Sequence, residues 1–454
     1  MNKQKVMVSI QLNVAFLRYV TFATFGLLVA CATSGTTLPS PKQAYGSQPV
    51  YNYPLNDPYA ATVITVPPEL KVDYSNVPIP TDRTITLFEE RAIPDGFWYQ
   101  RGLKYAELLQ KDPAPLVYII PGTGADSQAS IMRTLANILY SSGYSVVLLP
   151  SPTNPNFIIN ASKDFLPGPP THDAFDIYRL IQAIDHKISQ KTTVTGHMLV
   201  GYSLGAIDAA FTAQLDNTQQ RINFNKILLI NPPFSLYSSI KMLNDYLYSD
   251  LPNGMDGAGL FVKRVITRFS KLSHGEEALN FENEHYLLDY YTKFHPSDNQ
   301  LASIIGLSFR LSAGDMIFTS DVMRHGGYVF PKDETFTTST NLNLYLAVAL
   351  RTSFLDYFND VLSQADTSEN KSLTKAEIIN ESSLASATPY LFHNTKIGLI
   401  TNRDDIILAP GDLESLLNLF GPNAVVFPTG GHMGNIALPA MAYQIVTFMK
   451  KPLP

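Results

Sequence analysis

The chain has 454 residues and a formal net charge of −6, from 33 lysine and arginine residues against 39 aspartate and glutamate residues. This balance argues against nucleic acid as a partner, because nucleic-acid binding relies on clusters of basic side chains that face the phosphates. Cys31 is the only cysteine, which excludes an internal disulfide and a cysteine-based metal cluster. The histidines are scattered without the spacing of metal ligands, so we expect no metal site.

The N-terminus has the pattern of a secretion signal. Three basic residues precede an uncharged stretch over residues 19–30, which is too short to span a bilayer comfortably but suits the core of a signal peptide. The stretch ends in Leu-Val-Ala-Cys31, which resembles the lipobox of bacterial lipoproteins. The resemblance implies that residues 1–30 are a lipoprotein signal peptide and that Cys31 is the lipidation site. An ordinary signal peptide that happens to contain a cysteine is the alternative.

The next elements indicate a tether followed by an α/β domain. Residues 31–80 are rich in Ser, Thr, Pro, Asn and Tyr without a sustained period, and we expect an extended tether. Short apolar runs then alternate with amphipathic helical patterns, which is typical of parallel strands connected by helices. The sequence therefore predicts an α/β fold with a mostly parallel, doubly wound sheet, whose first part covers residues 81–234. Strands are expected over 85–88, 97–108, 115–120, 144–150 and 226–232, and helices over 127–142 and 172–188.

Ser203 stands between two glycines, in Gly201-Tyr-Ser-Leu-Gly205, after an apolar run and before a helix-forming stretch. A chain that leaves a buried strand and enters a helix within one tight turn holds its central residue in a strained conformation. Glycines on both sides remove the β-carbons that would collide there. The Ser203 hydroxyl would project above the sheet edge, and the first helical amide, that of Leu204, would face a developing oxyanion. A turn serine that caps the helix is the alternative reading.

Two further segments follow the serine in a suggestive order. One apolar run, residues 396–401, breaks into a turn that carries Asp404 and Asp405, and a second run, residues 424–428, ends in the glycine-flanked His432. Nucleophile, acid and histidine follow one another in this order in α/β-hydrolases, whereas the other serine triads have different orders. With the strand–turn–helix around the serine, the chain resembles the α/β-hydrolase superfamily of serine hydrolases, in particular its esterase- and lipase-like members.

The resemblance implies a catalytic triad of Ser203, His432 and one of two adjacent aspartates. If Asn402 takes the left-handed turn position where the family usually has glycine, the acid is Asp405, which we favour, and Asp404 is a solvated turn residue. A turn at Thr401 would instead select Asp404 as the acid.

The resemblance also implies an oxyanion hole. The family's oxyanion loop corresponds to Pro-Gly-Thr-Gly124, which follows the expected strand 115–120 and lacks the family's usual histidine. Thr123, or Gly124 beside it, should supply the second backbone donor together with Leu204, and the missing histidine matters little because the donors are backbone amides.

Residues 235–391 lie between the sixth and seventh expected strands, where α/β-hydrolases usually carry a cap or lid, and residues 392–454 complete the core. We expect the cap to be largely helical, with amphipathic patterns over residues 260–272 and 342–362. Some of its tyrosines should line an acyl or aryl pocket. They are Tyr237, Tyr246, Tyr248, Tyr286, Tyr290 and Tyr291.

These features predict a serine hydrolase that cleaves a carboxylic ester or related acyl bond through an acyl-enzyme and needs no cofactor. The expected substrate is a small-molecule or lipid acyl compound. The expected location is the bacterial cell envelope, where Cys31 would carry the lipid anchor. Ala32, rather than aspartate, in the following position resembles lipoproteins sorted to the outer membrane. An acyltransferase on the same scaffold and a non-catalytic surface lipoprotein that uses the fold for binding are the alternatives.

Overall fold

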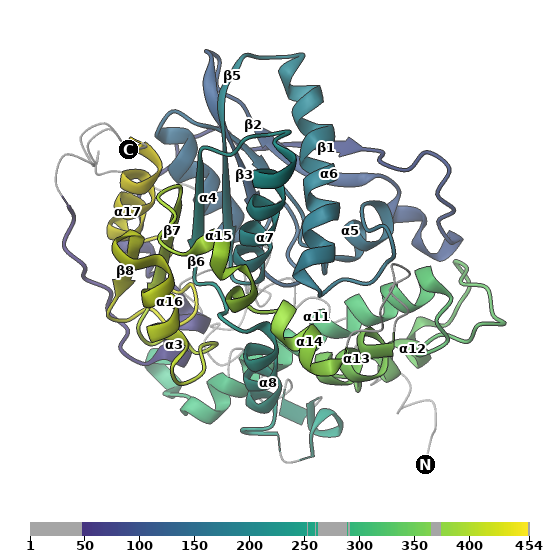
Figure 1. The fold of residues 1–454 in the computed structure, drawn as a ribbon. Coiled ribbons are helices and arrows are strands. Elements are labelled where there is room, and N and C mark those ends of the chain that lie inside the picture. The colour runs from purple at the N-terminus through teal and green to yellow at the C-terminus, as the bar shows by residue number, and fades with distance from the viewer. Residues whose placement is uncertain are drawn as a thin grey trace.

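The computed structural model describes residues 48–261 except 252 and 259, residue 288, and residues 291–364 and 374–452; the expected signal peptide and Cys31 lie outside this part of the chain. A sheet of eight strands in the order β1-β2-β4-β3-β5-β6-β7-β8 runs through the centre (Figure 1). β2 pairs antiparallel with both β1 and β4, and the pairs from β4 through β8 are all parallel. The strands are β1 (Thr81–Ile85), β2 (Leu103–Leu108), β3 (Ala114–Ile120), β4 (Ser145–Leu148), β5 (Val194–Tyr202), β6 (Lys226–Ile230), β7 (Ile397–Asn402) and β8 (Ala424–Phe427).

Helices cover both faces of this sheet, and the predicted α/β fold class is confirmed. The helices of the core are α4 (Ser130–Ser141), α5 (Pro155–Asn160), α6 (Pro170–Ser189), α7 (Leu204–Gln219), α15 (Thr388–Leu391), α16 (Asp412–Phe420) and α17 (Pro439–Lys450). One apolar layer joins α6, α7 and α16 to the sheet, and another joins α4 and α17 to the opposite face. In β3, Tyr118 belongs to the first layer and its neighbours Val117 and Ile119 to the second, because successive side chains of a strand alternate between faces.

The expected elements of the first half have observed counterparts, with two differences in their bounds. The first strand, expected over residues 85–88, is observed as β1 over residues 81–85. The run expected as one strand over residues 97–108 divides into a 3₁₀ helix, η2 (Asp95–Gln100), and β2. Gly102, between them, has a φ of +77°, a left-handed conformation that turns the chain and that an extended strand does not contain.

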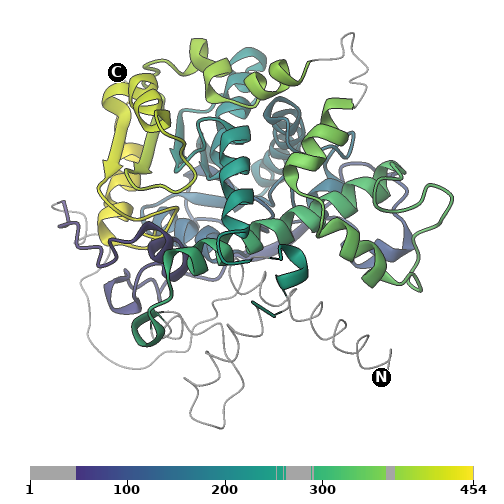
Figure 2. The ribbon, with the colours of Figure 1, turned by 90° about the horizontal axis from the view of Figure 1, so that it is seen from below.

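The described part of the segment between β6 and β7 is mostly helical and lies across the end of the sheet where the parallel strands finish (Figures 1 and 2). The helix expected over residues 342–362 is two helices separated by a break, and most of the pattern over residues 260–272 lies outside the described part of the chain. The described helices here are α8 (Leu236–Leu247), α11 (Asp298–Arg324), α12 (Leu342–Ala349), α13 (Phe354–Asp360) and α14 (Lys375–Glu381), with the 3₁₀ turns η3 (Leu362–Gln364) and η4 (Leu384–Ala387).

The helix α11 is the scaffold of this inserted segment. It has 27 residues and begins with a capping box between Ser297 and Gln300. Among the described helices it alone is long and apolar enough to cross a membrane, yet 72% of its apolar window is buried inside the protein. It packs against α8, α5, α12 and the N-terminal helix α3 (Pro58–Ile64). In this structure α11 is therefore a core helix of the insert.

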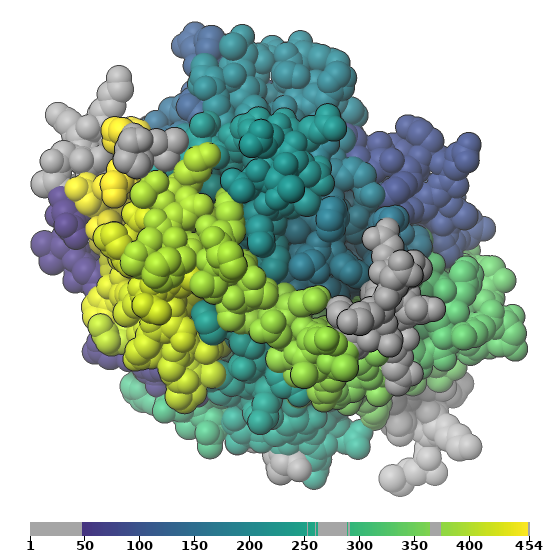
Figure 3. Space-filling model, in the orientation of Figure 1, coloured from purple at the N-terminus to yellow at the C-terminus, as the bar shows by residue number. Residues whose placement is uncertain are grey.

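Within the expected tether, residues 58–64 form a helix that packs on the core, which differs from the extended chain expected there. Asp57 caps α3 by accepting a hydrogen bond from the Ala60 amide at 2.8 Å, and proline occupies the first helical position. Ala60, Ala61 and Ile64 are buried in the apolar layer that contains α17. Proline and polar residues suit helix caps and turns as well as tethers, so composition alone does not separate the two. We call residues 48–66 the N-terminal arm, which lies against the C-terminal part of the chain (purple against yellow in Figure 3).

Candidate active site

Ser203 occupies a strained turn between β5 and α7. Its φ of +54° and ψ of −126° lie in a region that non-glycine residues rarely adopt. A β-carbon at Gly201 would be 1.9 Å from the Gly205 carbonyl oxygen, and one at Gly205 would be 2.3 Å from the Ile120 oxygen. Only glycine fits at either position, so the local sequence permits a turn that lifts the serine above the end of the sheet.

The structure brings Ser203, His432 and Asp405 into one hydrogen-bonded series. His432 Nε2 lies 2.9 Å from Ser203 Oγ. On the other side of the ring, His432 Nδ1 lies 3.0 Å from Asp405 Oδ1 and 3.1 Å from Oδ2. The side chain of Asp405 is fully buried and that of His432 is 16% exposed. This is the arrangement of a nucleophile, a general base and a group that orients the base.

Asn231 is a residue of this site that the sequence reasoning missed. It follows β6, and its Nδ2 donates a 2.6 Å hydrogen bond to Asp405 Oδ2. Asp405 also accepts the Ile407 amide at 3.1 Å, so its position is held from three sides. The local signal was weak: Asn231 has a φ of +47°, which asparagine tolerates, and it precedes a proline after an apolar strand.

Asp404 contacts the same loop but not the histidine ring. Its Oδ1 accepts the Gly431 amide at 3.0 Å and its Oδ2 the Gly430 amide at 3.1 Å. Burial raises the pKa of this carboxyl above its usual value, and the two amides oppose that shift. Asp404 is therefore not the solvated turn residue that we expected; it holds the glycine segment that precedes His432.

Asn402 also differs from its expected role. It is the buried last residue of β7 rather than a left-handed turn residue. Its Nδ2 donates to the Gly431 carbonyl at 2.8 Å, and its amide group exchanges hydrogen bonds of 2.7 and 3.1 Å with that of Asn435. Glycine has no side chain that could make these hydrogen bonds, whereas the asparagine side chain makes all three.

Thr123 and Leu204 lie beside Ser203 at the cavity described below. Leu204 is the first residue of α7, so its N–H has no partner within the helix. The Gly124 amide donates to Thr153 Oγ1 at 2.7 Å and is thereby occupied, which leaves Thr123 as the better second donor. The loop approaches the serine closely, since a β-carbon at Gly122 would be 3.4 Å from Ser203 Oγ.

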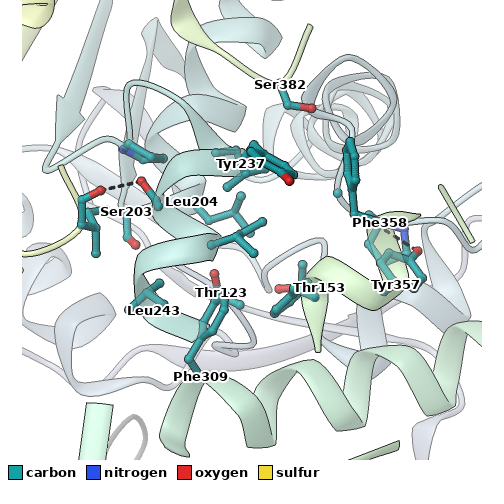
Figure 4. Close-up of a pocket in the computed structure, with 18 of the residues that line it drawn as sticks. Thr123, Thr153, Ser203, Leu204, Tyr237, Leu243, Phe309, Tyr357, Phe358 and Ser382 are labelled. Atoms are coloured by element: carbon teal, nitrogen blue, oxygen red, sulfur yellow. Dashed lines mark hydrogen bonds between the residues drawn. The ribbon is translucent and has the colours of Figure 1, made fainter. Parts of the chain in front are cut away.

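An apolar cavity opens beside Ser203 between the sheet and the inserted helices (Figure 4). It encloses about 710 Å³ of empty space, part of which is open to solvent. The insert supplies most of its walls, and none of the described residues that line it is charged. Of the tyrosines expected at a pocket, Tyr237 lines this one, whereas Tyr248 is exposed and Tyr286 and Tyr290 lie outside the described residues.

The remaining titratable groups do not suggest a second centre. Within the described residues, no group of three His, Cys, Asp or Glu side chains is placed to hold a metal ion. His197 pairs with Asp185 at 2.7 Å, and Tyr118 donates to the same carboxylate at 3.0 Å. This pair holds α6 against β3 and β5, away from the cavity, and has no nucleophile beside it.

No protein-family model matches the chain, and no curated protein matches it in sequence. Similar solved structures include a proline iminopeptidase-related protein from Thermus thermophilus, with 13% identity over 82% of this chain and 98% of that chain and a TM-score of 0.36. A thermostable esterase from Pseudomonas putida has 14% identity over 84% and 83% with a TM-score of 0.37, and the bacterial brefeldin A esterase has 12% over 82% and 75% with a TM-score of 0.39. At these values the likeness says nothing of activity or substrate.

The chain's own topology is more informative. Ser203 follows β5, Asp405 follows β7 and His432 follows β8, in a sheet whose strands from β4 to β8 are parallel. The fold is that of the α/β-hydrolases. In this α/β-hydrolase fold the three side chains meet at the ends of the strands, where ligands of open α/β sheets bind.

Proposed function

We propose that this chain is a serine hydrolase that cleaves a carboxylic ester or related acyl bond through a covalent acyl-enzyme. One observation carries the proposal: His432 is hydrogen-bonded to Ser203 Oγ on one side and to the buried Asp405 on the other, beside an apolar cavity. The strained backbone of Ser203 supports it further, since such strain is common at active-site nucleophiles.

In the proposed reaction Ser203 Oγ attacks the acyl carbonyl carbon while His432 Nε2 takes the hydroxyl proton. Asp405 keeps the Nδ1 proton on its own side of the ring and stabilises the imidazolium. The amides of Thr123 and Leu204 would bind the oxyanion, and each such donor contributes about 3 kcal/mol. His432 then returns its proton to the leaving alcohol. A water molecule, deprotonated by the same nitrogen, attacks the acyl carbon. The bond between this carbon and Ser203 Oγ then breaks, His432 returns the proton to Oγ, and the acid is released.

Labelling with a fluorophosphonate probe, followed by turnover of p-nitrophenyl butyrate, tests this proposal. We expect Ser203→Ala to remove both signals without a change in the thermal melting temperature, because only the nucleophile is lost. Ser189→Ala, at an exposed serine at the end of α6, is the matched control and should keep both. Turnover with and without an added alcohol distinguishes hydrolysis from acyl transfer. Wild-type turnover by Ser203→Ala would refute the proposal.

We further propose that lipid on Cys31 anchors the enzyme in the bacterial cell envelope, through the lipobox-like Leu-Val-Ala-Cys31. Because the N-terminal arm is folded, only residues 32–47 separate Cys31 from the first described residue. A chain of this length spans at most about 60 Å when fully extended, which would keep the active site near the membrane surface.

The anchor is tested by fractionation and by mass spectrometry of the mature N-terminus. We expect the wild-type protein to pellet with membranes and Cys31→Ser to appear as unprocessed or soluble protein, because acyl chains supply the membrane affinity. A mature N-terminus at another residue, or Cys31 without lipid mass, would contradict the anchor.

A further inference from the structure

The residues that line the cavity beside Ser203 mark two opposite ends of it. Ser203 and Leu204 lie at one end, and Phe358 and Tyr357 lie at the opposite end (Figure 4). Residues of α8 and α11, among them Leu243 and Phe309, line the space between these ends. A group attached to Ser203 would therefore extend along the inserted helices toward α13.

The walls of this cavity suit a neutral apolar group. Two polar side chains on them are already satisfied by the protein: the Tyr357 hydroxyl donates to the Pro167 carbonyl at 3.2 Å, and the Ser239 hydroxyl donates to the Ile407 carbonyl at 2.6 Å. A charged substituent would lose its hydration there without gaining an opposite charge from the described lining residues, and such desolvation is strongly unfavourable.

Aromatic pairs contribute to the walls of the cavity. The Tyr237 and Phe358 rings pack edge to face with centroids 5.3 Å apart, and Phe309 stacks on Phe354 at 4.8 Å. These contacts join α8 and α11 to α13. Residues of α8, α11 and α13 line the cavity beyond Ser203 and Leu204, so its walls continue past the place that an acetyl group on the serine would occupy.

Resting on the proposed serine-hydrolase function, we propose that this cavity binds the acyl part of the substrate as a neutral aliphatic chain longer than acetyl, and that Phe358 limits its length. The scissile carbonyl lies at Ser203, and the chain lies between α8 and α11 with its end at Phe358.

A series of p-nitrophenyl esters from acetate to dodecanoate, hydrolysed by the full-length protein, tests this proposal. We expect kcat/KM to rise by up to about fourfold for each added methylene, the equivalent of about 0.8 kcal/mol, and then to fall beyond a maximum. Phe358→Ala and the milder Phe358→Leu should move the maximum to longer chains. Phe392→Ala, at an exposed phenylalanine outside the cavity, is the matched control and should leave it unchanged. An ester of similar length whose chain ends in a carboxylate should react at least tenfold more slowly.

The outcomes separate this inference from the proposed function. Probe labelling of Ser203 with equal kcat/KM for all chain lengths would overturn the acyl site and leave the serine hydrolase in place. A chain-length maximum that neither Phe358 variant moves would overturn the role of Phe358. A wild-type protein that neither labels nor turns over any ester would overturn both.

The N-terminal arm supports a second, independent inference, because it contacts the loop that carries His432. The His432 amide donates to Thr62 Oγ1 at 2.9 Å, and the Thr62 hydroxyl donates to the Pro58 carbonyl at 2.7 Å. The second bond directs the hydroxyl proton away from His432, so that a lone pair faces its amide. The Tyr51 hydroxyl also donates to the Thr429 carbonyl in the same loop.

The arm and this loop meet backbone to backbone. A β-carbon at Gly431 would be 2.2 Å from the Pro58 carbonyl oxygen, and one at Gly434 would be 2.1 Å from the Ala61 oxygen. The loop therefore cannot approach α3 with any other residue at these two positions.

On the same proposed function, we infer that the arm is a positioning element for catalysis and that Thr62 is a positioning residue for His432. Thr62 touches neither Ser203 nor the cavity. It acts through the backbone of His432, whose ring must stay within hydrogen-bonding distance of Ser203 Oγ.

Thr62→Val keeps the shape of the side chain and removes the acceptor, whereas Thr62→Ser keeps the acceptor. One neutral hydrogen bond is worth about 1 kcal/mol, so we expect Thr62→Val to lower kcat about fivefold with KM and melting temperature nearly unchanged. Thr62→Ser should retain wild-type kcat. Thr218→Val, at an exposed helical threonine whose hydroxyl donates four residues back, is the matched control. Unchanged kcat in Thr62→Val would overturn this inference. A loss of kcat that follows the loss of melting temperature and also appears in Thr62→Ser would overturn it as well. Retained turnover in Ser203→Ala would instead overturn the proposed function.

Discussion

Replacing each of the two adjacent aspartates by asparagine tests the assignment of the acid most directly. Asp405 accepts hydrogen bonds from His432 Nδ1 at 3.0 Å, Asn231 Nδ2 at 2.6 Å and the Ile407 amide at 3.1 Å. An asparagine here has one oxygen and one NH₂ group, so an NH₂ would face another donor. His432 can relieve that contact by carrying its proton on Nε2, which then cannot accept the proton of Ser203.

The size of the expected loss follows from this tautomer change. In a serine protease, replacing the triad aspartate by asparagine lowers turnover about 10⁴-fold, which corresponds to roughly 5.4 kcal/mol of transition-state stabilisation. Since Asp405 is fully buried and makes the same kind of contact with the histidine, we expect a loss of about this size for Asp405→Asn.

Asp404→Asn should have a much smaller effect. It removes one of the two amide hydrogen bonds to Gly430 and Gly431, and a hydrogen bond to a charged group is worth about 1.5–3 kcal/mol. The loop keeps its hydrogen bonds to Asn402 and Thr62. The loss of one bond at Asp404 should therefore displace His432 only slightly. We expect kcat to fall by about tenfold or less.

The assay is kcat for p-nitrophenyl butyrate with the full-length protein, with Ser203→Ala as the background. Asp412→Asn, at the first residue of α16, where the carboxylate accepts the Ala409 amide at 2.9 Å, is the matched control and should stay near wild type. A large loss in Asp404→Asn with Asp405→Asn near wild type would reverse the assignment. Small losses in both would refute the reasoning, because the histidine would then be oriented by another group.

Three further variants follow from the same contacts. Asn231→Ala removes a donor to the buried Asp405, and we expect kcat to fall by about ten- to a hundredfold at unchanged KM; wild-type kcat would contradict its positioning role. Gly431→Ala places a methyl group against the Pro58 carbonyl at a residue with a φ of +54°, so both the melting temperature and kcat should fall, and unchanged values would mean that the arm can move aside. Asp208 of α7 is fully buried, neither of its oxygens has a hydrogen-bond partner in the described part of the chain, and burial raises its pKa well above the usual range. The folded state therefore holds a proton that the unfolded state releases, and stability falls as pH rises above the unfolded pKa. Asp208→Asn should raise the melting temperature, more at pH 8 than at pH 5, and a gain independent of pH would contradict a protonated Asp208.

Features that depend on neighbours in sequence could be predicted without the structure. The two glycines around Ser203 act within five residues, because each removes a β-carbon that would strike the adjacent turn. The apolar runs of β3, β6 and β7 are buried on both faces, and the order of serine, aspartates and histidine depends only on chain direction. These local signals were sufficient for the fold class, for the placement of Ser203 and His432 at the strand ends, and for a pair of adjacent candidate acids.

What only the tertiary structure decided depends on contacts between distant parts of the chain. Asp405 faces the His432 ring, whereas Asp404 faces the Gly431 amide, and each contact joins residues that are 27 positions apart. The sequence alone could not give these two side-chain directions. Asn231 meets Asp405 across 174 residues, and Thr62 meets His432 across 370. Composition predicted a tether over residues 31–80 because the apolar face of α3 is short and packs against segments that are distant in sequence, among them α11 and α17. The cavity beside Ser203 likewise exists only where α8, α11 and α13 pack over the end of the sheet, an arrangement set by burial of their apolar faces rather than by any local pattern.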